Sequence, residues 1–311
     1  MKRNLLCILA SVFAFSCTMQ EGPVNDELTN KQGVTFVSAS FDESVKTSLG
    51  SLVGNKRSVY WSNGDVLNIN GASSEALADV QAQQASATFK FNEELSYPYK
   101  AIYPASIYKS ENTVTLPAKQ AWANGTFATN TAPAAAYMTM PGNLALKNLC
   151  GVVKFKLLQQ SGGDTDKIAS VAFKSNNNEK VSGDFSIDYN KLAIEEANST
   201  LLAEQTVTVT VNQGLSTSQA LEVYVVVPAR EYTKGFTLTI IDQNGHTMEV
   251  AKASSINVVA GQILSMSTPV EFEPTFTSII IDTPSKLNAF AKAFNNGEYD
   301  VDVDVKVISD L

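Results

Sequence analysis

The stretch GFTLTIIDQNG, residues 235–245, carries the pattern that decides the fold. Its apolar side chains Phe236, Leu238 and Ile240 alternate with threonines, which places one face of a strand in a core and the other in water. Asn244-Gly245 then separates this run from a second alternating run. Because an Asn-Gly pair between two such runs is the strongest short-range hairpin signal, the stretch predicts an antiparallel β-hairpin.

The same period-two alternation recurs along the chain. It is clear in VTFVSASF (34–41), GDFSIDY (183–189) and QTVTVTV (205–211). Further strand patterns cover residues 58–62, 65–70, 87–91, 98–103, 113–116, 151–158, 167–174, 191–195, 221–227, 247–252, 255–259 and 263–267. Short strands separated by Asn, Gly and Asp turns are typical of antiparallel β-sandwiches or barrels, so the sequence predicts an all-β fold.

The N-terminus has the layout of a secretory signal. Lys2 and Arg3 precede the apolar run Leu5–Phe15, which is shorter than the roughly 20 residues that a membrane-spanning helix needs. The tetrapeptide AFSC (14–17) resembles a bacterial lipobox, in which a signal peptidase cuts before the cysteine and the thiol then carries a diacylglycerol. The alternative is an ordinary signal peptide followed by an accidental cysteine.

Processing at this point makes residues 1–16 a lipoprotein signal peptide and Cys17 the lipid attachment site. Two or three acyl chains on one residue hold a protein on a membrane stably, whereas a single chain does not. The polar residues 17–33 then read as a tether between the lipid and the first domain. Cys150 is left as a lone thiol that cannot form an internal disulfide, and we expect it to be a small buried hydrophobe.

Composition and motifs exclude several classes of function. The chain has a formal net charge of -8 and no basic run, which argues against a nucleic-acid partner. Its single histidine, His246, follows the Asn-Gly turn, where we expect a solvated hairpin tip. One histidine excludes Ser-His-Asp, Cys-His and multi-histidine metal sites, and the glycine motifs of nucleotide-binding and hydrolase folds are absent. The sequence therefore predicts a protein that is not an enzyme and uses no cofactor or metal.

Two domains are expected, because the strand content exceeds that of one small sandwich. NGTFATNTAPAAA (124–136) has weak periodicity and is followed by a Pro-Gly-Asn turn at 141–143. A new strand series starts after this turn. We therefore predict an N-terminal β-sandwich domain over 34–142 and a C-terminal one over 143–273.

Residues 274–311 have a different pattern. A short strand is followed by Thr283-Pro284, which suits a helix N-cap and first turn, and by apolar residues at helical spacing from Leu287 to Phe294. An alternating strand comes next. Its aspartates imitate a calcium loop, but Val305 and Leu311 stand where the required glycine and glutamate would be. We predict a strand–helix–strand unit that starts a further module continuing beyond residue 311.

Four stretches occur in an order that matches one known family. They are KTS (46–48) with VYWSNGD (59–65), TVTLPAKQ (113–120), LKNLCGVVKFKL (146–157) and VVVPAREYTKGFTLTIIDQNG (225–245). Together they resemble the fimbrillin-like, type V pilin-like lipoproteins of Bacteroidales, over about residues 34 to 272. The resemblance implies two transthyretin-like Greek-key domains, anchoring in the outer membrane at the cell surface, and a role as fimbrial subunit, anchor or tip adhesin.

The resemblance also gives Arg57 a candidate role. In that family an Arg-specific protease removes the first strand, and subunits then join by donor-strand exchange. Arg57 is the first arginine after the signal peptide and lies in GNKRSVYW (54–61), where we expect a loop. It is therefore a candidate maturation site, with an ordinary solvated loop residue as the alternative. The end of the chain departs from the pilin pattern, which favours a tip or non-polymerised protein over a stalk subunit.

The expected partners are other fimbrial subunits, joined by strand addition, and host or bacterial surface receptors or glycans. A second hypothesis is a lipid-anchored glycan-binding protein of a polysaccharide uptake system, with Trp61 and Trp122 stacking on sugars. Exposed, coplanar tryptophan rings on one surface would favour that hypothesis, whereas apolar surroundings favour two core anchors. A third possibility is that residues 34–272 are spacers that carry an enzyme beyond residue 311.

Overall fold

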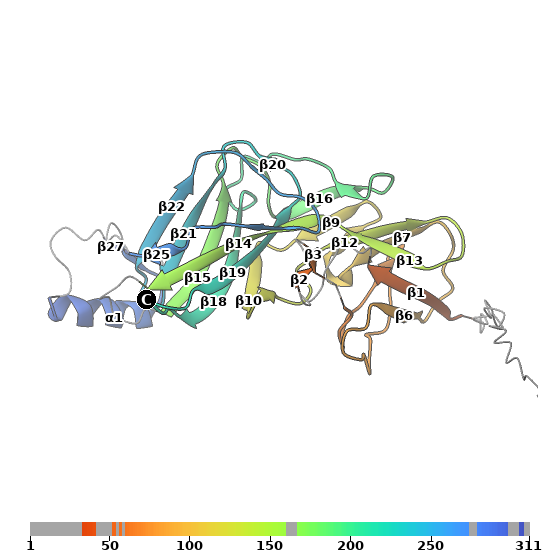
Figure 1. Ribbon diagram of the computed structural model, residues 1–311, viewed down its shortest axis with the longest axis horizontal. Helices are drawn as coiled ribbons and strands as arrows, with labels where there is room; N and C mark the ends of the chain where they lie inside the picture. The colour runs from red at the N-terminus through yellow and green to blue at the C-terminus, as the bar shows by residue number, and fades with distance from the viewer. Residues whose placement is uncertain are drawn as a thin grey trace, which may run out of the picture.

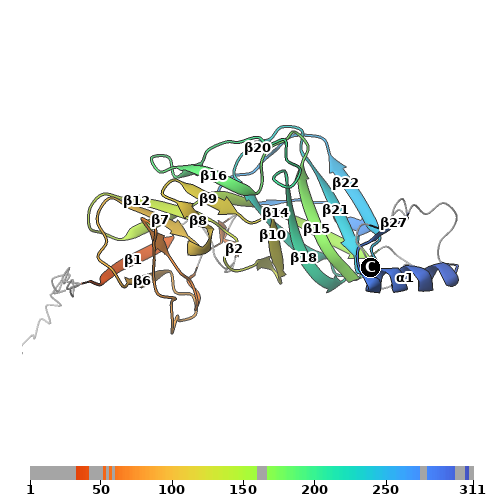
Figure 2. The same cartoon turned by 180° about the vertical axis from the view of Figure 1, so that it is seen from behind.

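The computed structural model describes residues 33–41, 60–159, 167–273, 279–297 and 305–307, and the backbone alone of 52–53, 56–57 and 306. The predicted signal peptide, Cys17 and the tether lie outside the described residues. Figures 1 and 2 show an elongated arrangement of sheets, with β1 (Thr35–Phe41) toward one end and helix α1 (Pro284–Asn295) at the other. The described part is nearly all β, which confirms the predicted fold class.

A seven-stranded sheet forms the N-terminal end of the molecule. Its strands, in spatial order, are β5 (Ala72–Ser73), β4 (Asn68–Ile69), β7 (Tyr99–Tyr103), β12 (Ala134–Met138), β13 (Leu144–Asn148), β1 and β6 (Ser86–Phe91). Alternate residues of these strands face one buried cluster, which we call the N-terminal core and which includes Phe89, Phe91, Tyr103, Leu144 and Leu146. The period-two pattern thus places one side chain in two inside this core.

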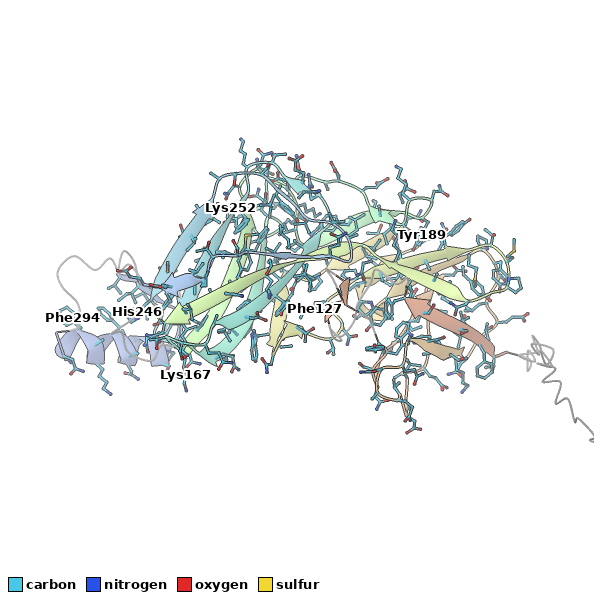
Figure 3. All side chains as sticks on the ribbon, in the orientation of Figure 1. Phe127, Lys167, Tyr189, His246, Lys252 and Phe294 are labelled. Carbon is cyan, nitrogen blue, oxygen red and sulfur yellow. The ribbon has the colours of Figure 1, made fainter. Side chains whose placement is uncertain are left out.

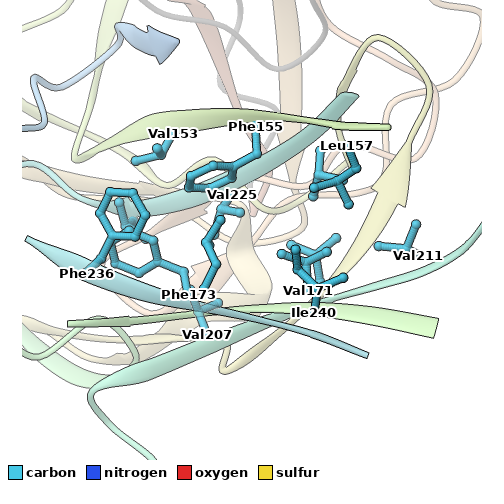
Figure 4. Close-up of a cluster of buried hydrophobic side chains, with 14 of the residues drawn as sticks. Val153, Phe155, Leu157, Val171, Phe173, Val207, Val211, Val225, Phe236 and Ile240 are labelled. Carbon is cyan, nitrogen blue, oxygen red and sulfur yellow. The ribbon is translucent and has the colours of Figure 1, made fainter. Parts of the chain in front are cut away.

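Two further sheets form a face-to-face β-sandwich. One contains β11 (Thr126–Phe127), β10 (Lys119–Ala123), β18 (Thr206–Gly214), β15 (Lys167–Ser175), β21 (Phe236–Asp242) and β22 (Thr247–Lys252). The other contains β19 (Leu221–Pro228), β14 (Cys150–Gln159), β24 (Ile263–Ser265) and β25 (Val270–Phe272). Figure 4 shows Phe155 of β14 facing Phe173 and Phe236 across the sandwich core. Strands β21 and β22 form the hairpin that the Asn-Gly turn predicts.

A four-stranded sheet lies between the N-terminal sheet and the sandwich. Its order is β17 (Ala193–Ile194), β16 (Gly183–Asp188), β9 (Thr113–Leu116) and β8 (Tyr108–Ser110), with the 3-10 turn η1 (Ala105–Ile107) before β8. A third buried cluster joins the parts: Ile102 and Ala135 come from the seven-stranded sheet, Phe185 from β16 and Tyr224 from β19. Strands β20 (Glu231–Tyr232) and β23 (Ile256–Asn257) form a two-stranded ribbon, and so do β2 (Leu52–Val53) and β3 (Lys56–Arg57).

The strands do not separate at the predicted boundary between residues 142 and 143. Strand β9 pairs antiparallel with β16, and β10 pairs parallel with β18, so strands from before and after the boundary share the same sheets. The N-terminal core also extends past the boundary to Leu146. The division into domains 34–142 and 143–273 stays a prediction, and its two parts share hydrogen-bonded sheets.

Several local expectations differ from the structure. A strand is predicted at 58–62, but residues 60–62 are not in a strand. The backbone N–H of Trp61 donates to the carbonyl of Gln84, and the chain then enters a turn. Strand β12 lies partly in the stretch 124–136, whose weak periodicity indicated a domain boundary, and β13 comes before the first strand expected after that boundary. Pairing is also less uniformly antiparallel than expected, since β14 pairs in parallel with both β24 and β25.

The C-terminal unit has the predicted order of strand, helix and strand. Strands β26 (Ile279–Ile281) and β27 (Val305–Val307) pair in parallel, and α1 lies between them in the chain. Thr283 caps the helix by accepting a hydrogen bond from the backbone N–H of Lys286, as its position before proline predicts. No residue of α1 is buried. Within the described residues, no helix has the length and apolar character needed to cross a membrane.

Candidate strand-exchange site

Strand β1 lies inside the seven-stranded sheet although it comes first in the described chain. It pairs antiparallel with β6 from Thr35 to Ser40, and parallel with β13 from Ala39 to Phe41. In the described part of the chain, β6 stands at the end of the sheet and pairs only with β1. Strand β1 therefore holds β6 on the sheet. Its removal would leave a slot with unpaired backbone groups along both walls.

The side chains of β1 alternate between the core and the surface. Val37 and Ala39 are 4% and 0% exposed, whereas Phe36 on the opposite face is 38% exposed. Full burial of a valine contributes about 1.5–3 kcal/mol, and the smaller alanine contributes less. The partly buried Phe41 also packs against this core, so the side chains and the backbone pairing together hold β1. Another strand with small apolar residues at alternate positions would fit the same slot.

Polar side chains fasten both ends of β1. At its start, the Thr35 hydroxyl donates to the carbonyl of Glu93 at 2.9 Å and accepts from the backbone N–H of Leu95 at 3.0 Å. Near its end, the Asn143 amide donates to Ser40 at 2.7 Å and accepts from Ser38 at 3.2 Å. Sequence reasoning did not identify these contacts, because Ser, Thr and Asn residues far apart in sequence form no motif.

Trp61 forms the floor beneath β1. It is 2% exposed, and its indole Nε1 donates a hydrogen bond to the carbonyl oxygen of Ala39 at 3.2 Å. Its ring centroid lies 4.3 Å from that of Phe41 and 4.9 Å from that of Phe89. Trp61 is therefore a core anchor, as its apolar surroundings predict.

Asp65 fixes the turn that brings Trp61 to this position. Its carboxylate accepts hydrogen bonds from the Tyr103 hydroxyl at 2.7 Å and from the backbone N–H of Ser62 at 2.8 Å. Burial raises the pKa of Asp65, while these two hydrogen bonds oppose the rise. The stretch VYWSNGD, which carries part of the family resemblance, thus contains the turn that places an indole under β1.

Arg57 lies in the chain between β1 and Trp61. The sequence predicts a loop here, but the structure places Arg57 in the short strand β3, opposite Leu52 of β2. Two-residue strands give little sequence signal, which explains the difference. A cut after Arg57 would leave β1 and the β2–β3 ribbon on one fragment and Trp61 on the other. Cleavage at Arg57 and lipidation of Cys17 both stay predictions.

The two tryptophans do not form a joint sugar-binding surface. Trp61 belongs to the N-terminal core, whereas Trp122 packs partly buried against the sandwich core and donates from Nε1 to the carbonyl of Glu222 at 2.8 Å. The two rings therefore do not form the exposed, coplanar surface that would favour the glycan-binding hypothesis.

Two other predicted residues have different outcomes. Cys150 is buried as expected, and burial raises the pKa of its thiol. His246 lies in the connection between β21 and β22 as expected, but the expectation that it is solvated is wrong: its side chain is 16% exposed, and Nδ1 lies 2.8 Å from a carboxylate oxygen of the buried Asp242. Asp242 is the last residue of β21, and the turn after it folds the chain back so that the imidazole ring of His246 lies beside the Asp242 carboxylate. The described residues contain no group of three or more His, Cys, Asp or Glu side chains that could hold a metal ion.

These features define an all-β protein with a sandwich, in which the first described strand is inserted between two others of its sheet. No protein-family model and no curated protein matches the chain. It is similar to the crystal structure of a candidate cell adhesion protein from Bacteroides ovatus, with 11% identity and a TM-score of 0.42 over 74% of this chain and 89% of that one. A candidate cell adhesion protein from Bacteroides uniformis gives 12% identity and a TM-score of 0.39, over 76% and 94% of the two chains. A fimbrial protein from Bacteroides ovatus gives 10% identity and a TM-score of 0.30, over 81% of this chain and 46% of that one.

Proposed function

We propose that this chain is a fimbrillin-like lipoprotein of the bacterial outer membrane, anchored through Cys17, with a structural or adhesive role at the cell surface. The observation that carries the proposal is the position of β1 between β6 and β13, where a strand from another subunit could replace it. The lipobox-like AFSC and the order of the family-like stretches support the anchoring and the surface location.

Replacement of β1 is favoured over simple loss. Without β1, strand β6 loses its pairing to the sheet, and Phe89, Phe91 and Leu144 of the N-terminal core become accessible to water. Apolar surface exposed in this way costs about 25 cal/mol per Å². An incoming strand that pairs with both walls removes this cost and restores the ladder, which is the physical basis of strand addition.

Cleavage at Arg57 is the step that would make β1 replaceable. After a cut there, the fragment that contains β1 is held by non-covalent contacts alone, so a neighbour's strand can compete for the slot. Without a cut, the chain connects β1 to Trp61, and an intramolecular strand has a large concentration advantage over a strand from another molecule. Uncleaved protein would then be a non-polymerising surface lipoprotein.

An Arg-specific protease tests the proposal, because the predicted mature chain contains two arginines, Arg57 and Arg230. Purified protein would be treated with the protease and run on gels without boiling. A ladder of SDS-resistant oligomers that Arg57→Ala abolishes and Arg230→Ala preserves would support self-assembly. Cleavage at Arg57 without oligomers would exclude self-assembly and leave a surface protein that does not polymerise.

A further inference from the structure

A shallow pocket of about 590 Å³ lies where the seven-stranded sheet meets the four-stranded sheet. Lys100 of β7 and Tyr137 of β12 are direct cross-strand partners on the outer face of the seven-stranded sheet. Tyr189, next to the end of β16, comes from the other sheet and belongs to the buried cluster between the sheets. Figure 3 labels Tyr189 at this end of the four-stranded sheet. Pockets between packed units are frequent ligand sites.

Two tyrosine rings and Ile187 form the apolar part of this pocket. Tyr137 is 39% exposed, whereas Tyr189 is 8% exposed. Their ring centroids are 6.2 Å apart and their planes are inclined by 46°, so the rings form a corner rather than a flat platform. The Lys100 ammonium lies 5.4 Å from the centroid of the Tyr189 ring, so the more exposed Tyr137 ring offers the main contact face for a small ring and Tyr189 bounds one side of it. Tyrosine suits the task, because it offers a large rigid surface and loses little conformational entropy on binding.

Hydrogen-bonding groups of both kinds surround the rings. Asp188 accepts from the backbone N–H groups of Asn190 and Lys191 and pairs with the Lys191 ammonium at 2.9 Å. The hydrogen bond from the Lys191 side chain is the largest cause that lowers the pKa of Asp188, which keeps it an ionised acceptor. Glu195 adds a second carboxylate, and Asn112 adds an amide. Burial raises the pKa of Tyr189, so its hydroxyl stays protonated.

The charges around the pocket disfavour an anionic ligand. The Lys100 ammonium lies 2.5 Å from the carboxylate of Glu111 and also donates to Asn112 at 3.0 Å, so its charge is already compensated. The Asp188 charge is likewise paired, with Lys191, and Glu195 adds a further carboxylate to the lining. A ligand with an acidic group would meet the like charge of Glu195, whereas a neutral hydroxyl group can donate to it.

We propose that this pocket binds a neutral saccharide of one or two sugar units. A sugar ring has C–H faces that pack on aromatic rings, and a rim of hydroxyl groups that both donate and accept hydrogen bonds. The tyrosine corner can pack against the C–H faces of the sugar, and the carboxylates and amides can form hydrogen bonds with its hydroxyl groups. The use of such binding in adhesion rests on the proposed function, but binding itself does not depend on β1 or on Arg57.

Binding of the full chain to a glycan array tests this site. One arm of the array would carry neutral glycans of animal cell surfaces, a second arm neutral fragments of bacterial polysaccharides, and a third arm sialylated and uronic-acid glycans. We expect signals on one or both neutral arms and none on the acidic arm. Tyr137→Ala should weaken the signals at least tenfold, Tyr137→Phe should retain most of them, and Glu195→Gln should weaken them severalfold.

Tyr97 supplies a matched control, because it is also 39% exposed but does not line the pocket. Tyr97→Ala should leave binding unchanged, and thermal unfolding should show that each variant is folded. Absence of wild-type binding to all neutral glycans, preference for the acidic arm, or equal losses in Tyr97→Ala and Tyr137→Ala would overturn the proposal. Since the array does not involve strand exchange, its result is independent of the protease experiment.

Discussion

The indole nitrogen of Trp61 donates a hydrogen bond to the carbonyl oxygen of Ala39 over 3.2 Å. This bond joins the two sides of the candidate cleavage site, because Ala39 precedes Arg57 in the chain and Trp61 follows it. It is also buried, since Trp61 and Ala39 are 2% and 0% exposed. The contact therefore holds β1 in its slot whether or not the chain between them is intact.

Trp61→Phe should destabilise the protein by about 1–3 kcal/mol, because the carbonyl of Ala39 loses its buried donor and the smaller ring leaves space. The same change should speed release of the β1 fragment from protein cut at Arg57. Trp122→Phe is the matched control, since it removes the equivalent bond to Glu222 in the sandwich. It should lower the free energy of unfolding without changing β1 release. Equal release rates in the two variants would contradict this role of Trp61.

Asp65 should make stability depend on pH in a direction that is unusual for a carboxylate. Its pKa is raised by burial, so the native protein binds this proton more tightly than the unfolded chain does, and the resulting stability falls as pH rises. Urea unfolding from about pH 3 to about pH 7 should show Asp65→Asn gaining stability relative to wild type as pH rises.

Glu179 gives the opposite slope and serves as the control for this titration. Burial alone would raise its pKa, but hydrogen bonds from Ser175 and Thr233 outweigh burial and lower it. Its ionised form therefore stabilises the native state above the ordinary pKa of glutamate, and this stability is lost as pH falls. Glu179→Gln should lose stability relative to wild type as pH rises. Slopes of the same sign for the two variants would contradict the assignment.

The helix α1 should be the first described part that proteases cut. Leu287 and Phe294 are 40% and 64% exposed and no residue of α1 is buried, whereas Ile279 and Ile281 of β26 are almost fully buried. Segments with few buried contacts open at low free-energy cost. Limited chymotrypsin digestion followed by mass spectrometry should find cuts in 284–295 while the sandwich stays intact. Protection of α1 equal to that of β15 or β21 would show that another part of the chain covers it.

The lipid anchor is tested in cells. Growth with a labelled fatty acid should label the wild-type protein, and Cys17→Ser should abolish the label. Cys7→Ser is the control, because Cys7 lies in the predicted signal peptide and is removed with it. Equal labelling of wild type and Cys17→Ser would exclude lipidation at Cys17.

Local alternation predicted the elements whose two faces differ clearly. Strands β9 and β22 have the predicted bounds, and the β21–β22 hairpin follows from its Asn-Gly turn. Strand β12 is not predicted, because both of its faces are buried. Ala134 and Ala136 face the N-terminal core and Ala135 faces the third cluster, so the sequence shows no alternation. The sequence predicts a strand at Trp61, where the structure has a turn, because aromatic residues are common in strands.

The candidate sites depend on pairing between distant segments, which no local pattern reveals. The sequence indicated Arg57 through a family resemblance, but the slot itself depends on β1 inserting between β13 and β6. The polar contacts of Asn143 with Ser38 and Ser40 depend on the same insertion. Likewise, Tyr137 and Tyr189 come from different sheets, so the corner between their rings exists only in the folded chain.

The most direct measurement follows the exchange of β1 itself. A fluorescent peptide of residues 34–41 would be mixed with the full chain before and after cleavage by an Arg-specific protease, and its uptake followed by fluorescence polarisation. A peptide with Ala39→Glu is the control, because it would place a charge at a position that is 0% exposed. We predict uptake of the native peptide by the cleaved protein only, and no uptake of the control peptide. Equal uptake of both peptides, or no uptake after complete cleavage at Arg57, would contradict a replaceable first strand.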